Sequence, residues 1–230
     1  MNTLVNYQLD NGTAILQISN GKVNALSPDV INELNHALDR ASEDRAVVIL
    51  TGQPGMFSGG YDLQVMTSGP QQALDLVAMG SALTRRMLAH PYPVIAACPG
   101  HAVAKGAFLL LASDYRLASE GDFKIGLNEV QIGMTMHQAG LLLARDRLLP
   151  QVFQRAVINA EMFNPHSACN AGFVDEVVPA EQLMERAQQV AGQLAKLNMR
   201  AHHQTKLRAR AQLLDALDEA IRLDLQHSFE

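Results

Sequence analysis

Apolar and polar residues alternate over two short runs near the start of the chain, Leu4 to Leu9 and Thr13 to Ile18. Asn11-Gly12 stands between them, a pair that suits a turn with positive φ angles. These runs predict a β-hairpin. Ser27-Pro28-Asp29 follows and is typical of a helix start. The next apolar residues have helical spacing and are Val30, Ile31, Leu34, Ala37, Leu38 and Ala41.

Short apolar runs and longer helical patterns then alternate along the chain. Ala46 to Leu50 and Val94 to Ala97 have the length and composition of buried strands. The segment between them is predicted to be helical from Gln71 to Ala89, where two prolines follow and end the helix. Strands that alternate with helices over the first two thirds of the chain predict the α/β class with a mostly parallel sheet.

The last fifty residues have a different pattern. From Glu181 to the end the apolar positions keep helical spacing, with a break expected between Asn198 and His203. These helices are too apolar to stand free in water, so they should pack on the body or on another subunit. We therefore expect an α/β core over residues 1–180 and a helical region over residues 181–230.

Composition excludes several classes of protein. The chain has 230 residues, 48% of them hydrophobic, and a formal net charge of −5, which argues against a nucleic-acid binder. Two cysteines, Cys98 and Cys169, provide neither a disulfide framework nor a metal cluster, so we expect reduced thiols and no metal. Neither a signal peptide nor an apolar run of about 20 residues is visible, and a cytoplasmic protein without membrane contact is expected.

Two glycine-containing segments are candidates for chemistry. The loop from Thr51 to Leu63 contains Gly59-Gly60 and would let backbone approach a ligand closely, although such loops are often only turns. The stretch from Pro99 to Gly133 contains a turn of small residues that leads into an apolar helix, and later a single carboxylate, Glu129. A helix start offers free N–H donors for an oxyanion, and a nearby carboxylate could act as a base.

Four places in the chain, in this order and with fitting separations, resemble the crotonase superfamily, the enoyl-CoA hydratase/isomerase family. The resemblance covers essentially the whole chain, and any one of its motifs alone is weak. The motifs are Asn24-Ala25-Leu26, Phe57-Ser58-Gly59-Gly60-Tyr61-Asp62-Leu63, Gly100-His101-Ala102 through Gly106, and Gly126-Leu127-Asn128-Glu129 with Gly133.

The resemblance implies a spiral of ββα turns with a helical C-terminal trimerisation region, and thus a homotrimer or a dimer of trimers. It also implies an acyl-coenzyme A substrate, with no separate cofactor because coenzyme A enters as part of the substrate. Family members hold the thioester oxygen between two backbone N–H groups, which by motif position belong here to Tyr61 and Lys105. Lys105 replaces the middle glycine of the family's Gly-Gly-Gly run, and the direction of its side chain is open.

The acidic residues of this chain differ from the two-glutamate pattern of the family's hydratases. Hydratases of the family use two glutamates; the second matches Glu129, whereas the first falls on Phe108. Moving a double bond needs only one base, and Ile125 to Glu129 resembles the Δ3,Δ2-enoyl-CoA isomerases, as does Asp114-Tyr115-Arg116. The implied function is therefore isomerisation by Glu129.

Two alternatives remain open. One is another acyl-CoA reaction, such as hydration or thioester hydrolysis, with His101, His137 or Asp62 as a second group. Asp62 is more readily explained as a helix cap, and His137 as a cap or surface residue. The other alternative is a coenzyme A-binding protein with little catalysis.

Substrate contacts are expected mainly from the two loops of the first half of the chain. The expected residues are Lys22, Ala25, Gly59, Tyr61, Asp62, Leu63, Gln64 and Phe108. Lys206, Arg208 and Arg210 in the helical region could reach a phosphate of coenzyme A, with an ordinary solvated helix face as the equal alternative.

Overall fold

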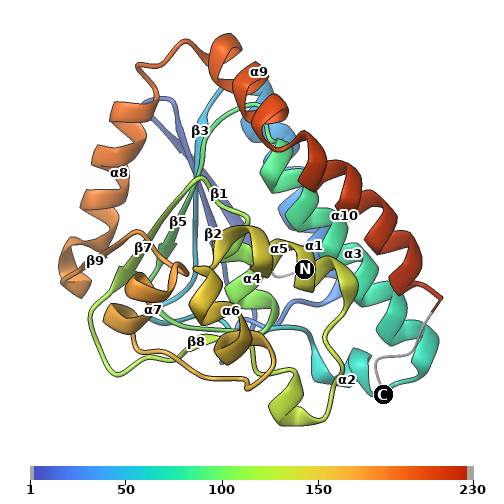
Figure 1. Cartoon of the computed structure of the whole chain (residues 1–230). Coiled ribbons are helices and arrows are strands. Elements are labelled where there is room, and N and C mark those ends of the chain that lie inside the picture. Colours follow the sequence, from blue (N-terminus) through green and yellow to red (C-terminus); the bar gives the residue numbers. More distant parts are fainter. Residues whose placement is uncertain (1–2, 227–230) are drawn as a thin grey trace.

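The computed structural model describes residues 3–226 and is built on a six-stranded sheet in the order β1-β2-β3-β5-β7-β9 (Figure 1). The first two strands are antiparallel and all later neighbours are parallel. These strands are β1 (Val5–Asp10), β2 (Thr13–Ile18), β3 (Val47–Thr51), β5 (Val94–Cys98), β7 (Tyr115–Ser119) and β9 (Glu176–Val178).

A second, three-stranded parallel sheet lies beside the first, in the order β4-β6-β8. Its strands are β4 (Gly55–Ser58), β6 (Gly100–Val103) and β8 (Ile125–Gly126). Three times the chain adds one strand to the large sheet, then one to the small sheet, and then forms helices. The expected crotonase-like spiral of ββα turns is thereby confirmed.

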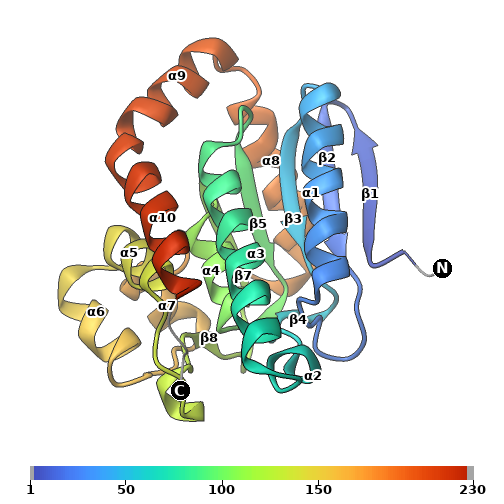
Figure 2. The ribbon, with the colours of Figure 1, turned by 90° about the vertical axis from the view of Figure 1, so that its right-hand side faces the viewer.

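Helices cover both faces of the large sheet. Helix α8 packs on one face, against β3, β5 and β7, while α1, α3 and α4 lie on the other (Figures 1 and 2). The helices are α1 (Pro28–Glu43), α2 (Leu63–Met66), α3 (Pro70–Ala89), α4 (Lys105–Leu111), α5 (Gln138–Arg147), α6 (Pro150–Val157), α7 (Pro165–Ala171), α8 (Leu183–Leu194), α9 (Met199–Ala209) and α10 (Ala211–Asp224). Short 3₁₀ turns, η1 (Val130–Ile132) and η2 (Ala180–Gln182), complete the chain.

The local signals of the first forty residues are confirmed. Asn11 and Gly12 have φ angles of 46° and 76°, as the hairpin turn requires. The Ser27 hydroxyl accepts a hydrogen bond from the Val30 N–H at 3.3 Å and so caps α1. All six apolar residues of the predicted helical stripe are buried against the sheet.

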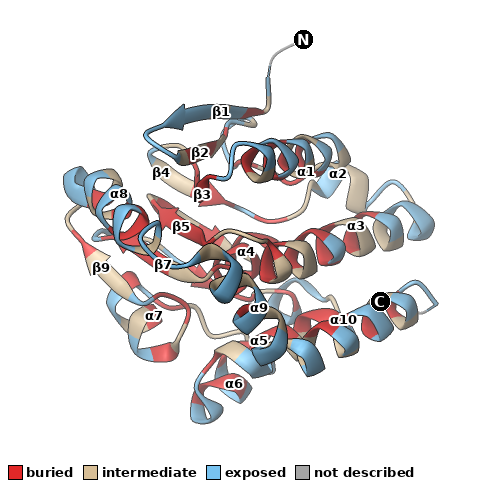
Figure 3. Cartoon of the chain, turned by 90° about the horizontal axis from the view of Figure 1, so that it is seen from above, coloured by how far each residue is buried: buried red, intermediate tan, exposed pale blue. Residues whose placement is uncertain are grey.

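The C-terminal helices fold onto the body of their own chain. Helix α10 lies along α3 and α5, and buried positions line the side that faces them (Figures 2 and 3). Packing of the apolar helical region on the body is thereby observed. Its role in subunit assembly, and the division into residues 1–180 and 181–230, stay predictions.

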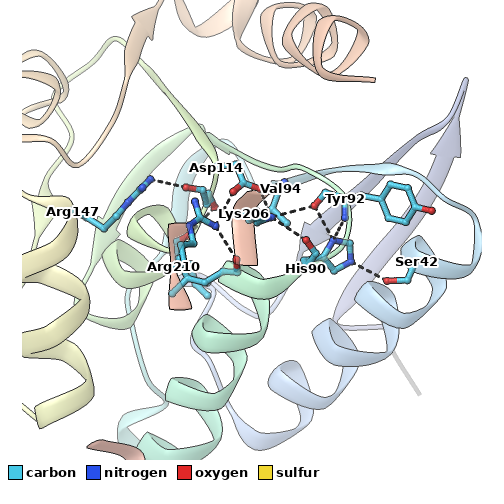
Figure 4. Close-up of polar contacts among 11 residues, drawn as sticks. Ser42, His90, Tyr92, Val94, Asp114, Arg147, Lys206 and Arg210 are labelled. Carbon is cyan, nitrogen blue, oxygen red and sulfur yellow. Dashed lines mark hydrogen bonds and ion pairs between the residues drawn. The ribbon is translucent and has the colours of Figure 1, made fainter. Parts of the chain in front are cut away.

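A buried ion cluster ties α9 to the ends of β5 and β7 (Figure 4). The Asp114 carboxylate lies 2.6 Å from Lys206 Nζ and 2.9 Å from Arg210 Nη1, and it accepts a hydrogen bond from the Val94 N–H at 2.8 Å. Lys206 also donates to the His90 carbonyl oxygen at 3.0 Å. Lys206 is buried, Asp114 and Arg210 are partly buried, and all three have hydrogen-bond or ion-pair partners.

This cluster corrects one expectation for the helical region. Lys206 is buried and both Lys206 and Arg210 are paired with Asp114, so they do not form an ordinary solvated helix face. Their contact with a phosphate of coenzyme A stays a prediction. Helical spacing alone could not show which cations meet a buried carboxylate ninety residues away. Arg208 is exposed, and its contact with a phosphate stays a prediction.

Candidate active site

Two loops that resembled the family are joined to each other by hydrogen bonds. The buried Asn24 amide donates to the Met56 carbonyl oxygen at 3.1 Å, and the Ser58 hydroxyl donates to the Asn24 carbonyl oxygen at 2.8 Å. Backbone bonding continues from Leu26 N–H to the Gly60 carbonyl oxygen at 2.8 Å. The Asn24 motif therefore acts as a support that fixes the path of the glycine-rich loop.

The backbone N–H groups of Tyr61 and Lys105 have no acceptor within the described residues. Lys105 is the first residue of α4, where an N–H has no partner in the helix. The two loops touch, because a β-carbon built on Gly60 would lie 3.0 Å from Ala104 Cβ and 3.5 Å from Lys105 N. An oxyanion hole requires two N–H groups on neighbouring segments that have no other acceptor.

Glu129 lies between β8 and η1 and is 7% exposed. Its backbone is held by the turn, since its carbonyl oxygen accepts from the Met134 N–H at 2.9 Å. The side-chain oxygen Oε2 is buried without a hydrogen-bond partner. Burial raises the pKa of Glu129 to about 7, and its own backbone N–H and Lys105 oppose that rise. A carboxylate with this pKa can both take and return a proton near neutral pH.

Two aromatic rings, from Phe108 and His137, pack against each other in the interior. Phe108 of α4 is 1% exposed, and its ring meets the His137 ring edge-on with centroids 5.4 Å apart. Gly140 makes room for both rings, because a β-carbon there would lie 2.7 Å from His137 and 2.9 Å from Phe108. Burial lowers the pKa of His137 to about 3, so the imidazole is neutral.

His137 is the N-cap residue of α5, in agreement with one of its two expected roles, although its side chain makes no cap hydrogen bond. It is buried, which corrects the alternative expectation of a surface residue. His101 is occupied elsewhere, since its Nδ1 accepts from the Lys124 N–H at 3.0 Å and its ring packs edge-on against Phe123. His101 therefore has a structural part, because it ties strand β6 to the segment that precedes β8.

The Lys105 side chain points inward, which decides the question that the sequence left open. The residue is 1% exposed, and Nζ lies 3.3 Å from the Thr84 hydroxyl oxygen. Nζ is also 5.8 Å from the Tyr61 ring centroid and 5.6 Å from that of Phe108. Burial lowers the pKa of Lys105 to about 7, while Glu129 acts in the opposite direction. Near neutral pH the buried Lys105 is therefore poised between its amine and ammonium forms.

Helix α3 contributes two residues that the sequence did not single out. Gly80 accommodates the Tyr61 side chain, because a β-carbon there would lie 2.2 Å from the phenol oxygen. That phenol donates to the Val77 carbonyl oxygen at 3.2 Å. Thr84, one turn further on, is the hydrogen-bond partner of Lys105. The only sequence signal was the presence of small residues on the inner side of α3.

The remaining residues expected to meet the substrate lie mostly at the surface of the two loops. Asp62 caps α2, since its Oδ1 accepts from the Gln64 N–H at 2.8 Å. Leu63 is 67% exposed, a high value for an apolar residue. Lys22, Gly59 and Gln64 are also exposed, and Ala25 is half-buried. Their contact with coenzyme A stays a prediction.

Disulfides, metal-ligand clusters and membrane-spanning helices are not evident in residues 3–226. Both cysteines are free thiols; burial raises the pKa of Cys98 to about 12, and Cys169 is half-buried. Within this range, no three or more His, Cys, Asp or Glu side chains gather as they would around a metal ion. Likewise, none of the described helices combines the length and apolarity that a membrane crossing needs.

A ββα spiral with two open N–H donors and a buried carboxylate defines a crotonase-type protein. The chain belongs to the enoyl-CoA hydratase/isomerase family, whose model matches residues 8–229. It is 29% identical to enoyl-CoA delta isomerase 1 of Rattus norvegicus mitochondria, over 97% of this chain and 79% of the relative. It is 28% identical to a crotonyl-CoA hydratase of Syntrophomonas wolfei, over 92% of this chain and 83% of the relative.

A solved structure is more similar still. An enoyl-CoA hydratase/isomerase family protein from Pseudomonas syringae shares 64% of its sequence with this chain, with a TM-score of 0.97. The match covers 98% of both chains. The sequence resemblance to the crotonase family is therefore confirmed, whereas relatives named for isomerase and for hydratase activity match at nearly the same identity.

Proposed function

We propose that this enzyme moves a double bond in acyl-coenzyme A thioesters, from the 3-enoyl to the 2-enoyl position. Glu129 is the single acid–base group, and the N–H groups of Tyr61 and Lys105 form the oxyanion hole. Coenzyme A enters with the substrate, so no separate cofactor is needed. The same proposal includes assembly as a homotrimer or dimer of trimers in the cytoplasm, as the family resemblance implies.

The reaction needs one proton and returns it. The Glu129 carboxylate removes a proton from C2, and the electron pair of that C–H bond enters a dienolate whose negative charge lies on the thioester oxygen. The two N–H groups stabilise that oxygen, each by about 3 kcal/mol. Protonated Glu129 then gives the proton to C4, and the thioester carbonyl is restored with the double bond between C2 and C3.

The observation that carries this proposal is a buried apolar residue at the motif position of the family's first glutamate. The position where the family's hydratases carry their first glutamate is occupied by Phe108, buried and packed against a neutral His137. Glu129 is the candidate carboxylate, and its Oε2 is buried without a hydrogen-bond partner. An aromatic wall cannot orient a water molecule by accepting its protons, so hydration lacks its second carboxylate.

Hydration of 2-enoyl-coenzyme A is the second candidate because of Lys105. Its buried ammonium could donate a hydrogen bond to the water that Glu129 deprotonates. The ammonium accepts no proton in its charged form, and it has hydroxyl and aromatic neighbours rather than a carboxylate partner. These features favour isomerisation, and a direct comparison of the two reactions decides between them.

The test is to assay the wild type and Glu129→Gln with 3-enoyl-, 2-enoyl- and saturated acyl-coenzyme A. Isomerisation should dominate in the wild type, and Glu129→Gln should lower its kcat by at least about 10²–10⁴-fold, because the only base is lost. Binding of a saturated acyl-coenzyme A should persist in both proteins. Faster hydration or thioester hydrolysis, binding without turnover, or near-normal turnover by Glu129→Gln would each contradict the proposal.

A further inference from the structure

The Lys105 side chain is a buried amine that the proposed isomerisation does not use, because the oxyanion hole needs only the backbone N–H of this residue. Any residue except proline supplies that N–H. The side chain nevertheless turns inward, is 1% exposed, and places Nζ 3.3 Å from the Thr84 hydroxyl oxygen. Burial of an amine is unfavourable unless it is hydrogen-bonded. Unused N–H groups at Nζ are therefore available to a ligand.

Nζ keeps hydrogen-bonding capacity that the protein does not use. A lysine amine has at least two N–H groups in either protonation state, and among the described residues Thr84 is its one hydrogen-bond acceptor. The Thr84 hydroxyl proton is donated within its own helix, to the Ser81 carbonyl oxygen at 2.9 Å. Thr84 therefore accepts from Lys105 and does not donate to it. At least one N–H group of Nζ is left without an acceptor.

A second buried hydroxyl lies on the same helix, one turn before Thr84. Ser81 is 2% exposed, and its Oγ makes no hydrogen bond, although it lies close enough to the Tyr61 phenol to oppose the rise in pKa that burial and Glu129 cause there. The phenol itself rests against Gly80, where a β-carbon would lie 2.2 Å from its oxygen. This part of α3 therefore adds polar groups with unused capacity next to the side chains of the oxyanion-hole residues.

The rings around Nζ connect it with the expected course of the acyl chain. Nζ lies 5.8 Å from the Tyr61 ring centroid and 5.6 Å from that of Phe108. Tyr61 and Lys105 are the residues whose backbone N–H groups would hold the thioester oxygen. Phe108 stands at the motif position where the family's hydratases carry a glutamate that activates water for the double bond. The amine therefore lies on the side of the oxyanion hole where the acyl chain would continue.

Nζ and the oxyanion hole are within one side-chain length of each other. The lysine side chain is a flexible stem that places Nζ at most about 7 Å from the backbone nitrogen of the same residue. An extended acyl chain advances by about 1.2 Å per bond. A group that lies about four to eight carbons along the chain can therefore contact Nζ while the thioester oxygen stays at the Lys105 N–H.

The group that fits Nζ best is a carboxylate. Among the described residues no carboxylate oxygen lies within 4.0 Å of Nζ, whereas the equally buried Lys206 has Asp114 at 2.6 Å. A buried ammonium that meets a carboxylate gains a charge-assisted hydrogen bond and a counter-charge. Burial lowers the pKa of Lys105 to about 7, and Glu129 opposes this, so the charged form that a carboxylate would stabilise is within reach at neutral pH.

We propose that Lys105 is a specificity residue whose amine binds a carboxylate at the far end of the acyl chain. The preferred substrates are then coenzyme A monothioesters of unsaturated dicarboxylic acids, rather than acyl chains that end in a methyl group. The inference rests on the proposed function and names the substrate class for it. The backbone of Lys105 holds the thioester oxygen and its side chain holds the other end of the chain, while Glu129 works at C2, separated from the bound carboxylate by the chain carbons.

The experiment compares saturated acyl-coenzyme A ligands that end in a carboxylate or in a methyl group, over chain lengths of about four to eight carbons. Calorimetric titration gives the Kd of each ligand without any turnover. At the best length the wild type should bind the dicarboxylic ligand at least about tenfold more tightly than its methyl-ended counterpart, because a hydrogen bond between charged groups forms only with the former. Methyl-ended ligands that bind as tightly at every length overturn the inference.

The variant Lys105→Met assigns the preference to this side chain. Methionine keeps the backbone N–H and a long side chain but removes the amine. The ratio of the two Kd values is the readout, so a loss common to both ligands cancels; the preference for the carboxylate should fall by at least about tenfold. Lys196→Met, which removes a positive charge from an exposed position, should keep the wild-type ratio. A preference that persists in Lys105→Met overturns the inference.

A neutral probe distinguishes the carboxylate from any other oxygen. A ligand of the same length that ends in a hydroxyl group should bind less tightly to the wild type than the dicarboxylic ligand. Equal binding of the two would show that the site recognises an oxygen atom without its charge, which contradicts the inference. This comparison and the wild-type ratio above need no variant, so they decide the matter even if Lys105→Met does not fold.

Binding and turnover separate the inference from the proposed function. Saturated ligands report recognition of the chain end in the absence of any reaction. A carboxylate preference that depends on Lys105, in a protein that isomerises no 3-enoyl-coenzyme A, would remove the function and leave the Lys105 site. Isomerisation of 3-enoyl-coenzyme A without a preference for a terminal carboxylate would do the opposite.

Discussion

Lys105 and Lys206 are both buried, and the fold treats them in opposite ways. Lys206 donates to the Asp114 carboxylate at 2.6 Å and to the carbonyl oxygens of His90 and Tyr92 at 3.0 and 3.4 Å. Lys105 has one weak neutral contact, with Thr84 at 3.3 Å. The Lys206 ammonium has an acceptor for each of its three N–H groups. Among the described residues, the Lys105 side chain has one hydrogen-bond acceptor, Thr84.

The contrast in contacts distinguishes a structural ion pair, Lys206 with Asp114, from a buried lysine and glutamate that the proposed reaction would use. A buried charge with all partners in place links distant segments, and it becomes costly only when one partner is removed. A buried carboxylate and ammonium that are not in contact are unfavourable for stability, but they leave oxygen and nitrogen atoms open to a ligand. Breaking each pair should therefore have opposite consequences.

The largest effect is expected for Asp114→Ala, which breaks the satisfied pair. It leaves Lys206 and Arg210 as buried cations without their carboxylate and removes the acceptor of the Val94 N–H. The free energy of unfolding should fall by about 3–5 kcal/mol. Urea unfolding measures this loss.

The matched control is Asp218→Ala on α10, which removes an exposed carboxylate paired with Arg85. It should change the free energy of unfolding by no more than about 1 kcal/mol. Similar losses in the two variants would show that the Asp114 cluster contributes no more than a surface ion pair.

The second effect has the opposite sign and depends on pH. Burial raises the pKa of Glu129 from 4.5 to about 7, so the folded protein holds a proton that the unfolded chain releases. The wild type therefore loses stability as pH rises from about 4.5 to about 7. Glu129→Gln removes that loss, and above pH 7 it should be more stable by about 1–3 kcal/mol.

Unfolding curves at pH 5 and pH 8 provide the measurement. The advantage of Glu129→Gln should be present at pH 8 and largely absent at pH 5. Glu120→Gln, at an exposed position, should change stability by no more than about 0.5 kcal/mol. An advantage of Glu129→Gln that is equal at both pH values would mean that the carboxyl group is not held near neutrality by burial.

Local sequence patterns predicted many of the helices and strands because short-range signals, such as turn residues, caps and apolar periodicity, determine these elements. The hairpin depends on Asn11-Gly12, and α1 depends on the Ser27 cap and its apolar stripe, all of which the structure contains. The pairing of three short strands into a second sheet is a long-range property, since β8 has only two residues and no pattern of its own. Family resemblance, not periodicity, indicated that spiral.

The candidate site was predictable only where the backbone defines it. Motif positions indicated Tyr61, Lys105, Phe108 and Glu129, and the structure places the Tyr61 and Phe108 rings near Lys105 Nζ. Side-chain direction was not predictable, because a lysine at a helix start can point to solvent or inward. Lys105 donates a hydrogen bond to Thr84 on α3, which lies twenty-one residues earlier in the chain. No sequence motif marks Thr84.

The smallest effect is expected for Thr84→Val, which removes the one hydrogen-bond acceptor of Lys105 and keeps the shape of the side chain. Its hydroxyl also donates to the Ser81 carbonyl oxygen within the same helix, a bond that the helix can spare. Stability should change by no more than about 1 kcal/mol. Because the lost oxygen favours the charged amine, the pKa of Lys105 should fall further below its usual value.

The consequence for turnover follows from that direction. The pH at which Lys105 loses its proton, followed by NMR of the carbon next to Nζ, should fall by less than one unit, while the acid limb of the kcat/KM profile, which reports Glu129, should stay in place. Thr205→Val on α9, at an exposed position away from Lys105, serves as the control and should change neither the Lys105 titration nor the acid limb. A shift of the acid limb alone would mean that Thr84 acts on the carboxylate rather than through Lys105, and it would weaken the contrast between the two lysines.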